Sequence, residues 1–171
     1  MKMKKPEIGI IMGSDSDWPI VKQAAETLED FAVPFEVKVI SSHRTPKLAS
    51  AYARGATRRG IKVIIAAAGG SAHLAGTLAA HTTLPVIGIP IKAGAVDGLD
   101  SLLATLQMPA GIPVATVTLG SAGPVNAAVL AVQILAVDRP ALGKKLAKYK
   151  NGLKRKVVQG DSKIQAELKK R

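Results

Sequence analysis

Short apolar runs alternate along the chain with segments whose apolar residues recur every three or four positions. Such runs are typical of buried strands, and such recurrence is typical of amphipathic helices. The runs predict five strands, at residues 7–12, 34–40, 62–67, 85–90 and 114–117. The periodic segments predict five helices, near residues 20–28, 48–59, 72–81, 101–106 and 124–136. Strand and helix therefore alternate from residue 7 to residue 136.

Strands with apolar residues on both faces and helical connections are typical of a parallel sheet covered on both sides. Five such units, joined by right-handed crossovers, predict an α/β fold of the flavodoxin-like class. We expect a doubly wound parallel sheet in a three-layer α/β/α arrangement at residues 1–140. With the strand order 2-1-3-4-5, a ligand would bind beyond the carboxyl ends of the first and third strands, where the order reverses.

A C-terminal extension is predicted at residues 141–171. Leu146, Tyr149, Leu153 and Val157 repeat there at helical spacing, which predicts a helix with little apolar surface of its own to bury. A helix of this kind could lie across a neighbouring subunit.

The positive charge of the chain is concentrated in this extension. The net charge is +12, and residues 141–171 hold 11 Lys or Arg against two acids, Asp161 and Glu167. Aromatic residues make up 3% of the chain, too few for the stacking platforms on which single-strand binders hold bases. We therefore read the extension as a solvated helix and do not expect nucleic acid as a partner. A non-catalytic nucleotide- or nucleic-acid-binding module is the alternative.

Composition excludes several kinds of functional site and bears on where the protein is located. The chain has no cysteine, which excludes disulfides, thiolate metal sites and a cysteine nucleophile. Residues 63–91 and 101–137 contain no Asp, Glu, Lys or Arg, but glycines and prolines interrupt both stretches. The apolar run at the N-terminus is too short for the core of a signal peptide. We therefore expect no membrane segment and a cytoplasmic location.

Three polar segments follow the first three predicted strands: residues 13–17, 41–45 and 68–73, here called the rim loops. In the first, Gly13 permits a sharp turn, and Ser14 and Ser16 place hydroxyls beside a helix start. Free amides and the helix dipole favour a phosphate there. Plain capping of the helix by Ser16 or Asp17 explains the same residues equally well. Asp15 and Asp17 also suggest a metal, but the lack of an obvious third acidic ligand argues against one.

The second and third rim loops add a guanidinium and two imidazoles. Arg44 could clamp a phosphate through two parallel hydrogen bonds, or form a surface ion pair. His43 can exchange a proton near neutral pH. Gly69 and Gly70 admit a close backbone approach, and His73 falls in the first turn of the next predicted helix. Neither a G-x-G-x-x-G fingerprint nor a P-loop lysine is present, which disfavours a dinucleotide or triphosphate ligand.

Six segments, in order, carry a resemblance to a known family: IIMGSDSDW, ISSHRTP, VIIAAAGGSAHLAG, LPVIGIP, GLDSLLATLQMPAGIPVATV and NAAVLAVQILA. They resemble the class I 5-(carboxyamino)imidazole ribonucleotide mutases of bacterial purine synthesis. The resemblance implies an isomerase that moves a carboxylate from the exocyclic nitrogen of its ribonucleotide to ring carbon C4, without metal, ATP or organic cofactor. It also implies a homo-octamer with sites at subunit contacts and the C-terminal helix packed on a neighbour.

The resemblance assigns a role to individual residues as well. It implies that the general acid and base is His43. The residues implied to hold the substrate phosphate and ribose are Ser14, Ser16, Arg44 and Asp17. Those that match the wall receiving the migrating carboxylate are Ser41, Ala68, Gly69, His73 and Leu74. The chain departs from the usual pattern at Ser42, Ala67, Ser71 and Ala75, and at residues 92–98, to which we assign no role.

The nearest alternative activity is that of the class II enzymes. They carboxylate aminoimidazole ribonucleotide directly with CO2, and they share the fold and the product. The HRT and AHL segments of this chain favour class I.

Overall fold

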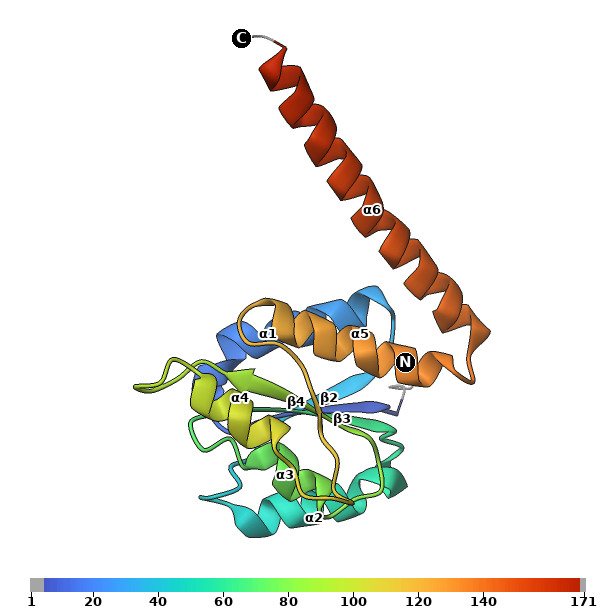
Figure 1. The fold of residues 1–171 in the computed structure, drawn as a ribbon. Coiled ribbons are helices and arrows are strands. Elements are labelled where there is room, and N and C mark those ends of the chain that lie inside the picture. Colours follow the sequence, from blue (N-terminus) through green and yellow to red (C-terminus); the bar gives the residue numbers. More distant parts are fainter. Residues whose placement is uncertain (1–4, 170–171) are drawn as a thin grey trace.

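The structure is a computed structural model that describes residues 5–169. Within these residues the chain forms a five-stranded parallel sheet with the order β2-β1-β3-β4-β5 (Figure 1), which confirms the predicted fold class and strand order. The strands are β1 (Ile8–Met12), β2 (Phe35–Val39), β3 (Val63–Gly69), β4 (Val86–Ile91) and β5 (Ala115–Thr116).

Helices cover both faces of this sheet. Helices α1 and α5 pack on one face, and α2 and α3 pack on the other (Figure 1). Successive side chains of a strand point to opposite faces, so Ile10 and Ile65 pack with α1 and α5, while Ile11 and Ile64 pack with α2 and α3. The helical elements are η1 (Asp15–Asp17), α1 (Trp18–Asp30), α2 (Pro46–Arg59), α3 (Leu74–Ala79), α4 (Leu99–Leu106), α5 (Ala122–Ala136) and α6 (Pro140–Leu168).

Strand β2 is not the buried strand that its apolar residues suggested. It lies at the edge of the sheet and pairs with β1. Its first three residues are half-buried, and Lys38 and Val39 are exposed. The alternation of Glu36 and Lys38 with apolar residues was the signal of an edge strand, because a charged side chain on an edge discourages pairing with another chain.

Local backbone chemistry sets the ends of the helices beside the rim loops. Helix α2 begins with Pro46 and ends at Arg59, and it is followed by Gly60, whose φ of 99° is left-handed. Helix α3 is shorter than the predicted residues 72–81, and it begins later than predicted because Ala72 (φ 45°) is left-handed and cannot belong to a right-handed helix.

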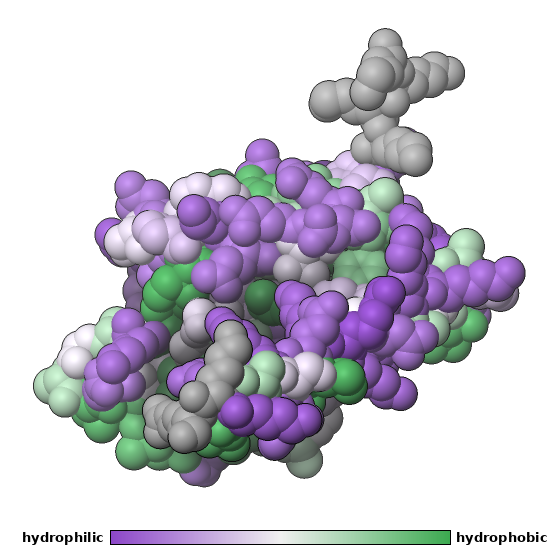
Figure 2. Space-filling view, turned by 90° about the horizontal axis from the view of Figure 1, so that it is seen from above, coloured by the Kyte–Doolittle hydropathy of each residue, from purple (hydrophilic) through white to green (hydrophobic). Residues whose placement is uncertain are grey.

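The C-terminal extension is a helix, as predicted, and only its beginning packs on the domain. Leu142 and Leu146 are buried against the layer of α1 and α5, and Tyr149 contacts the ring of Phe31 with centroids 5.5 Å apart. Beyond this point α6 projects away from the sheet (Figure 1), and Leu153 is 46% exposed. Seen from above, the surface is mainly hydrophilic, with separate hydrophobic patches (Figure 2). No helix within residues 5–169 is long and apolar enough to cross a membrane.

Candidate functional site

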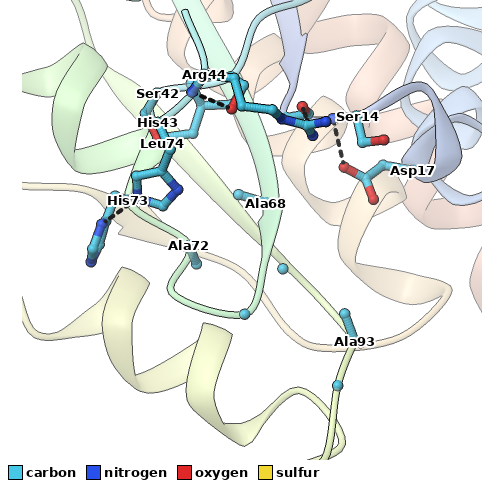
Figure 3. Close-up of a pocket in the computed structure, with 15 residues that line it drawn as sticks. Ser14, Asp17, Ser42, His43, Arg44, Ala68, Ala72, His73, Leu74 and Ala93 are labelled. Atoms are coloured by element: carbon cyan, nitrogen blue, oxygen red, sulfur yellow. Dashed lines mark hydrogen bonds between the residues drawn. The ribbon is translucent and has the colours of Figure 1, made fainter. Parts of the chain in front are cut away.

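A cavity of about 530 Å³ lies at the carboxyl ends of the strands, where the strand order reverses between β1 and β3. This volume is within the range of small-molecule sites. All three rim loops contribute to its lining (Figure 3), which confirms that the switch point brings them together. The parallel register explains the meeting, since Met12 pairs with Val39 on one side and with Ala67 on the other.

The first rim loop is a compact turn organised by Ser14. The hydroxyl of Ser14 accepts the amide of Ser16 (3.3 Å), and the amide of Ser14 donates to Asp17 Oδ2 (3.2 Å). These two bonds form a capping box for η1. Ser14 is therefore the N-cap of η1, while Asp17, one of the two candidate caps, occupies the N-cap position of α1 without a side-chain capping hydrogen bond there. The hydroxyl of Ser16 donates to Ser14 Oγ (2.9 Å), and Pro19 lies in the first turn of α1.

Asp17 is half-buried and faces the cavity. Burial raises the pKa of its carboxyl from the usual 3.8. The hydrogen bond from the backbone amide of Ser14 opposes this shift, and the negative charge of Asp15 adds to it. A raised pKa marks a carboxylate whose charge is poorly solvated. A ligand hydroxyl that donates to Asp17 would supply part of the missing solvation.

Paired hydrogen bonds close the second rim loop. Thr45 Oγ1 donates to the carbonyl of Ser41 (2.8 Å) and accepts the amide of Ser41 (3.1 Å). The amide of Arg44 donates to Ser41 Oγ (3.2 Å). This closed turn presents His43 and Arg44 to the cavity. The guanidinium of Arg44 extends toward Ser14 and Asp17 (Figure 3) and lies 3.5 Å from the carbonyl oxygen of Gly13.

The two imidazoles of the cavity contact each other directly. His43 Nε2 lies 2.7 Å from His73 Nδ1, and the rings meet edge to face with centroids 4.8 Å apart. The pair lies on the opposite side of the site from Ser14 and Asp17 (Figure 3). The site therefore has a hydroxyl and guanidinium end and an imidazole end.

The third rim loop forms the wall between these ends. Ala68 and Gly69 end β3, and Leu74 begins α3; all three line the cavity. Between them, the amide of Ala72 donates to the carbonyl of Gly69 (3.2 Å) across a tight turn. The wall is mostly backbone and small side chains, which allow a ligand to approach closely.

The residues on one side of the cavity were not predicted from the sequence. Ala93 and Gly94, which follow β4, line it, although no role had been assigned to residues 92–98. The strand order contained the signal: β4 lies beside β3, so the loop after β4 must reach the same rim. An ion pair between Lys92 and Asp97 (2.7 Å) spans this loop.

Not every residue singled out in the sequence lines the cavity. Ser16 does not line it, and its hydroxyl is hydrogen-bonded to Ser14, which does. Of the positions that depart from the family pattern, Ser42 lines the cavity and Ser71 is exposed outside it. Ala67 and Ala75 are buried in the core, at 0% and 2% exposure. The residues of the predicted set that do line the cavity are Ser14, Asp17, Ser41, His43, Arg44, Ala68, Gly69, His73 and Leu74.

The acidic side chains do not assemble into a metal site. Within residues 5–169, no group of three or more His, Asp or Glu is placed to hold a metal ion. Asp15 instead accepts the hydroxyl of Ser14 (3.2 Å) and the amide of Ser16 (3.1 Å).

Comparison with known proteins shows the family to which the chain belongs. The profile of the family described as AIR carboxylase matches residues 7–156. A Pyrococcus horikoshii protein named N5-carboxyaminoimidazole ribonucleotide mutase is 57% identical over 157 residues, which cover 92% of this chain and 88% of that protein. A Mycobacterium tuberculosis protein of the same name is 52% identical over 162 residues, covering 95% of this chain and 92% of that one.

A solved structure extends the likeness to the fold. The crystal structure of Treponema denticola PurE superimposes with a TM-score of 0.81 at 27% identity, and covers 92% of this chain and 98% of that one. The resemblance found in the sequence is thus confirmed over nearly the whole chain. This protein belongs to the AIR carboxylase family.

Proposed function

We propose that this protein is an isomerase of purine synthesis that converts N5-carboxyaminoimidazole ribonucleotide into its C4-carboxylated isomer. The observation that carries the proposal is the convergence of Arg44, the Ser14 turn and the His43–His73 pair on one cavity. The names of relatives at 57% and 52% identity support the same reaction.

The hydroxyl and guanidinium end of the cavity suits the ribose phosphate. Arg44 can donate two parallel hydrogen bonds to phosphate oxygens, and Ser14 lines the same volume. Ser16 would support Ser14 from behind through its hydroxyl bond. The poorly solvated carboxylate of Asp17, which lines the cavity, would accept hydrogen bonds from the ribose hydroxyls.

The imidazole end suits the proton transfers of the reaction. The substrate carries its carboxylate as a carbamate on the exocyclic nitrogen. When His43 donates a proton to that nitrogen, the N–C bond breaks and CO2 leaves. Ring carbon C4 then attacks the CO2 carbon, and His43 removes the C4 proton to restore the aromatic ring. One proton is given and one is taken back, so the reaction needs no other acid or base.

The freed CO2 must stay beside C4 until the new bond forms. The wall of Ser41, Ala68, Gly69 and Leu74 offers small groups and backbone around that position. Holding both reactants in one cavity makes the second step effectively unimolecular, which can lower its barrier by about 7–11 kcal/mol. Exclusion of water adds to this effect.

A neighbouring subunit would complete that exclusion. We propose that the chain forms a homo-oligomer, because His43, Arg44 and His73 remain exposed in the single chain and α6 carries exposed apolar residues beyond its packed first turns. The number of subunits, eight, is what the family resemblance implies. Light scattering after size exclusion should give eight times the 17.7 kDa chain mass. A monomer that is fully active at assay concentration would contradict the role of the neighbour.

The decisive assay supplies the carbamate ribonucleotide to the purified protein without ATP or metal. We expect rapid formation of the C4-carboxylated product. A parallel reaction supplies aminoimidazole ribonucleotide with bicarbonate and omits the carbamate. Consumption of the second pair of substrates, and not the first, would assign the direct carboxylase reaction instead.

Two variants separate the two ends of the cavity. His43→Asn should abolish turnover while the ribonucleotide still binds, since the phosphate end is intact. Arg44→Lys should keep turnover at saturating substrate but weaken binding, because lysine cannot make the two parallel bonds. Equal loss of kcat in both variants would contradict this division.

The basic extension offers a test of the nucleic-acid alternative. Truncation at residue 150 should leave the cavity residues in place, because the buried anchors Leu142 and Leu146 are retained. RNA or DNA binding that falls with added salt and is lost on truncation would support the alternative. The cytoplasmic location stays a prediction from the sequence.

A further inference from the structure

The contact between His43 and His73 constrains where their hydrogens lie. Nitrogen atoms 2.7 Å apart form a hydrogen bond, so one of them carries a hydrogen and the other a lone pair. The bond uses Nε2 of His43, which leaves its Nδ1 as the nitrogen available to a ligand.

We propose that His73 is a positioning residue: its Nδ1 accepts the Nε2–H of His43 throughout turnover and thereby reserves Nδ1 of His43 for proton exchange with the substrate. His73 takes this role only if His43 is the acid and base of the proposed reaction. The family resemblance places His73 in the wall of the carboxylate site, which is a different role.

The direction of the hydrogen bond follows from the reaction. When His43 is ready to donate, both of its nitrogens carry hydrogen, so its Nε2 can only donate to His73. After the proton on Nδ1 has gone to the substrate, the Nε2–H can stay where it is, and Nδ1 holds the lone pair that will accept the C4 proton. If His73 were the donor, its hydrogen would have to move at every proton transfer.

The backbone on both sides holds the rings in this contact. His43 lies in the turn closed by Ser41 and Thr45. His73 follows Ala72, a non-glycine residue with a φ of 45°, and its carbonyl accepts the amide of Thr77 (2.9 Å) at the start of α3. A left-handed alanine persists only where its surroundings enforce it, and such residues cluster at functional sites.

Substitutions of His73 test whether this residue acts as a hydrogen-bond acceptor or only forms part of the cavity wall. His73→Leu keeps bulk but removes the acceptor, whereas His73→Asn places an amide oxygen close to the position of Nδ1. We expect His73→Leu to lower kcat by roughly 10- to 100-fold, because a hydrogen bond to a charged group is lost. KM should change little, since the phosphate end is untouched. His73→Asn should recover most of kcat.

His81→Asn is the matched control. His81 lies outside the cavity, with Nδ1 2.8 Å from the carbonyl oxygen of Thr77, and its substitution should leave kcat unchanged. A His73→Leu variant with wild-type kcat, or one in which only KM rises, would overturn the positioning role. Equal kcat in His73→Leu and His73→Asn would also overturn it.

Nitrogen NMR tests the pair without any turnover. The chain has three histidines, so a 15N-histidine-labelled sample gives three imidazoles, assigned through the variants. We expect neutral His43 to carry its hydrogen on Nε2, and to lose this preference in His73→Leu but not in His81→Asn. Hydrogen on Nδ1 of neutral His43 overturns the inference, even if the protein is an active mutase. An inactive protein with hydrogen on Nε2 refutes the proposed function and leaves the pairing intact.

Discussion

Replacing Gly69 with alanine tests the wall between β3 and the loop after β4. A Cβ atom at this position would lie 2.9 Å from the Cβ of Ala93, 3.2 Å from the carbonyl oxygen of Ile91 and 3.6 Å from the Cβ of Ile91. Non-bonded carbons prefer separations of about 3.5–4.0 Å, so Ala93 must move by roughly 0.6–1.1 Å. The backbone of Gly69 is not left-handed, and the cost is therefore steric.

The expected cost follows from what can move. Overpacking costs about 1–3 kcal/mol, and because residues 92–98 are mostly exposed we expect Gly69→Ala to lower the free energy of unfolding by about 1–2 kcal/mol. The same movement shifts Ala93 and Gly94 at the cavity wall, so product affinity should fall as well. Urea unfolding followed by circular dichroism gives the first quantity, and calorimetric titration gives the second.

A double variant checks the assigned cause. Ala93→Gly in the Gly69→Ala background removes the shortest contact but keeps the one to Ile91, so part of the lost stability should return, with a coupling of at least about 0.5 kcal/mol. Gly70→Ala is the control: its φ of 60° makes alanine strained, but no atom lies within 4 Å of the new Cβ, and Ala93→Gly should not rescue it. Additive effects of Gly69→Ala and Ala93→Gly would refute the steric reasoning.

Four further substitutions probe the edge strand, the first rim loop and the extension. Tyr52→Phe loses the hydroxyl bond to Glu36 (2.9 Å) and should lower the free energy of unfolding by about 1 kcal/mol. Burial raises the pKa of Tyr52, so only the unfolded tyrosine ionises just above about pH 10, and the extra stability of the wild type over Tyr52→Phe should be lost there. A difference between the two urea midpoints that does not change with pH would contradict this. Asp17→Asn should be slightly more stable than wild type at pH 7, because burial raises the folded pKa of Asp17 and its charge disfavours folding, and the difference should vanish in thermal scans as the pH falls below 3.8. Leu146→Ala, at a site 8% exposed, should cost about 2–4 kcal/mol in urea unfolding, whereas Leu153→Ala, at 46% exposure, should change light-scattering mass more than the stability of the fold.

The alternation of strand and helix could be predicted from the sequence because burial requires a local pattern of apolar residues. A strand buried on both faces must be apolar at consecutive positions, and a covering helix must be apolar every three or four positions. Those two periods led to the parallel sheet, and the switch-point rule then placed Ser14, His43 and Gly69 at one rim. The family resemblance supplied the roles of these residues, which no periodicity contains.

Distances between side chains of different loops were decided by the tertiary structure. The 2.7 Å contact of His43 with His73 depends on the register of three strands and on the left-handed backbone of Ala72, neither of which the chemistry of a short segment encodes. The contribution of Ala93 and the exposure of β2 likewise follow from which strands are neighbours and which lies at the edge. The local sequence pattern indicates which residues must be buried, whereas the three-dimensional packing of the whole chain determines which residues contact each other.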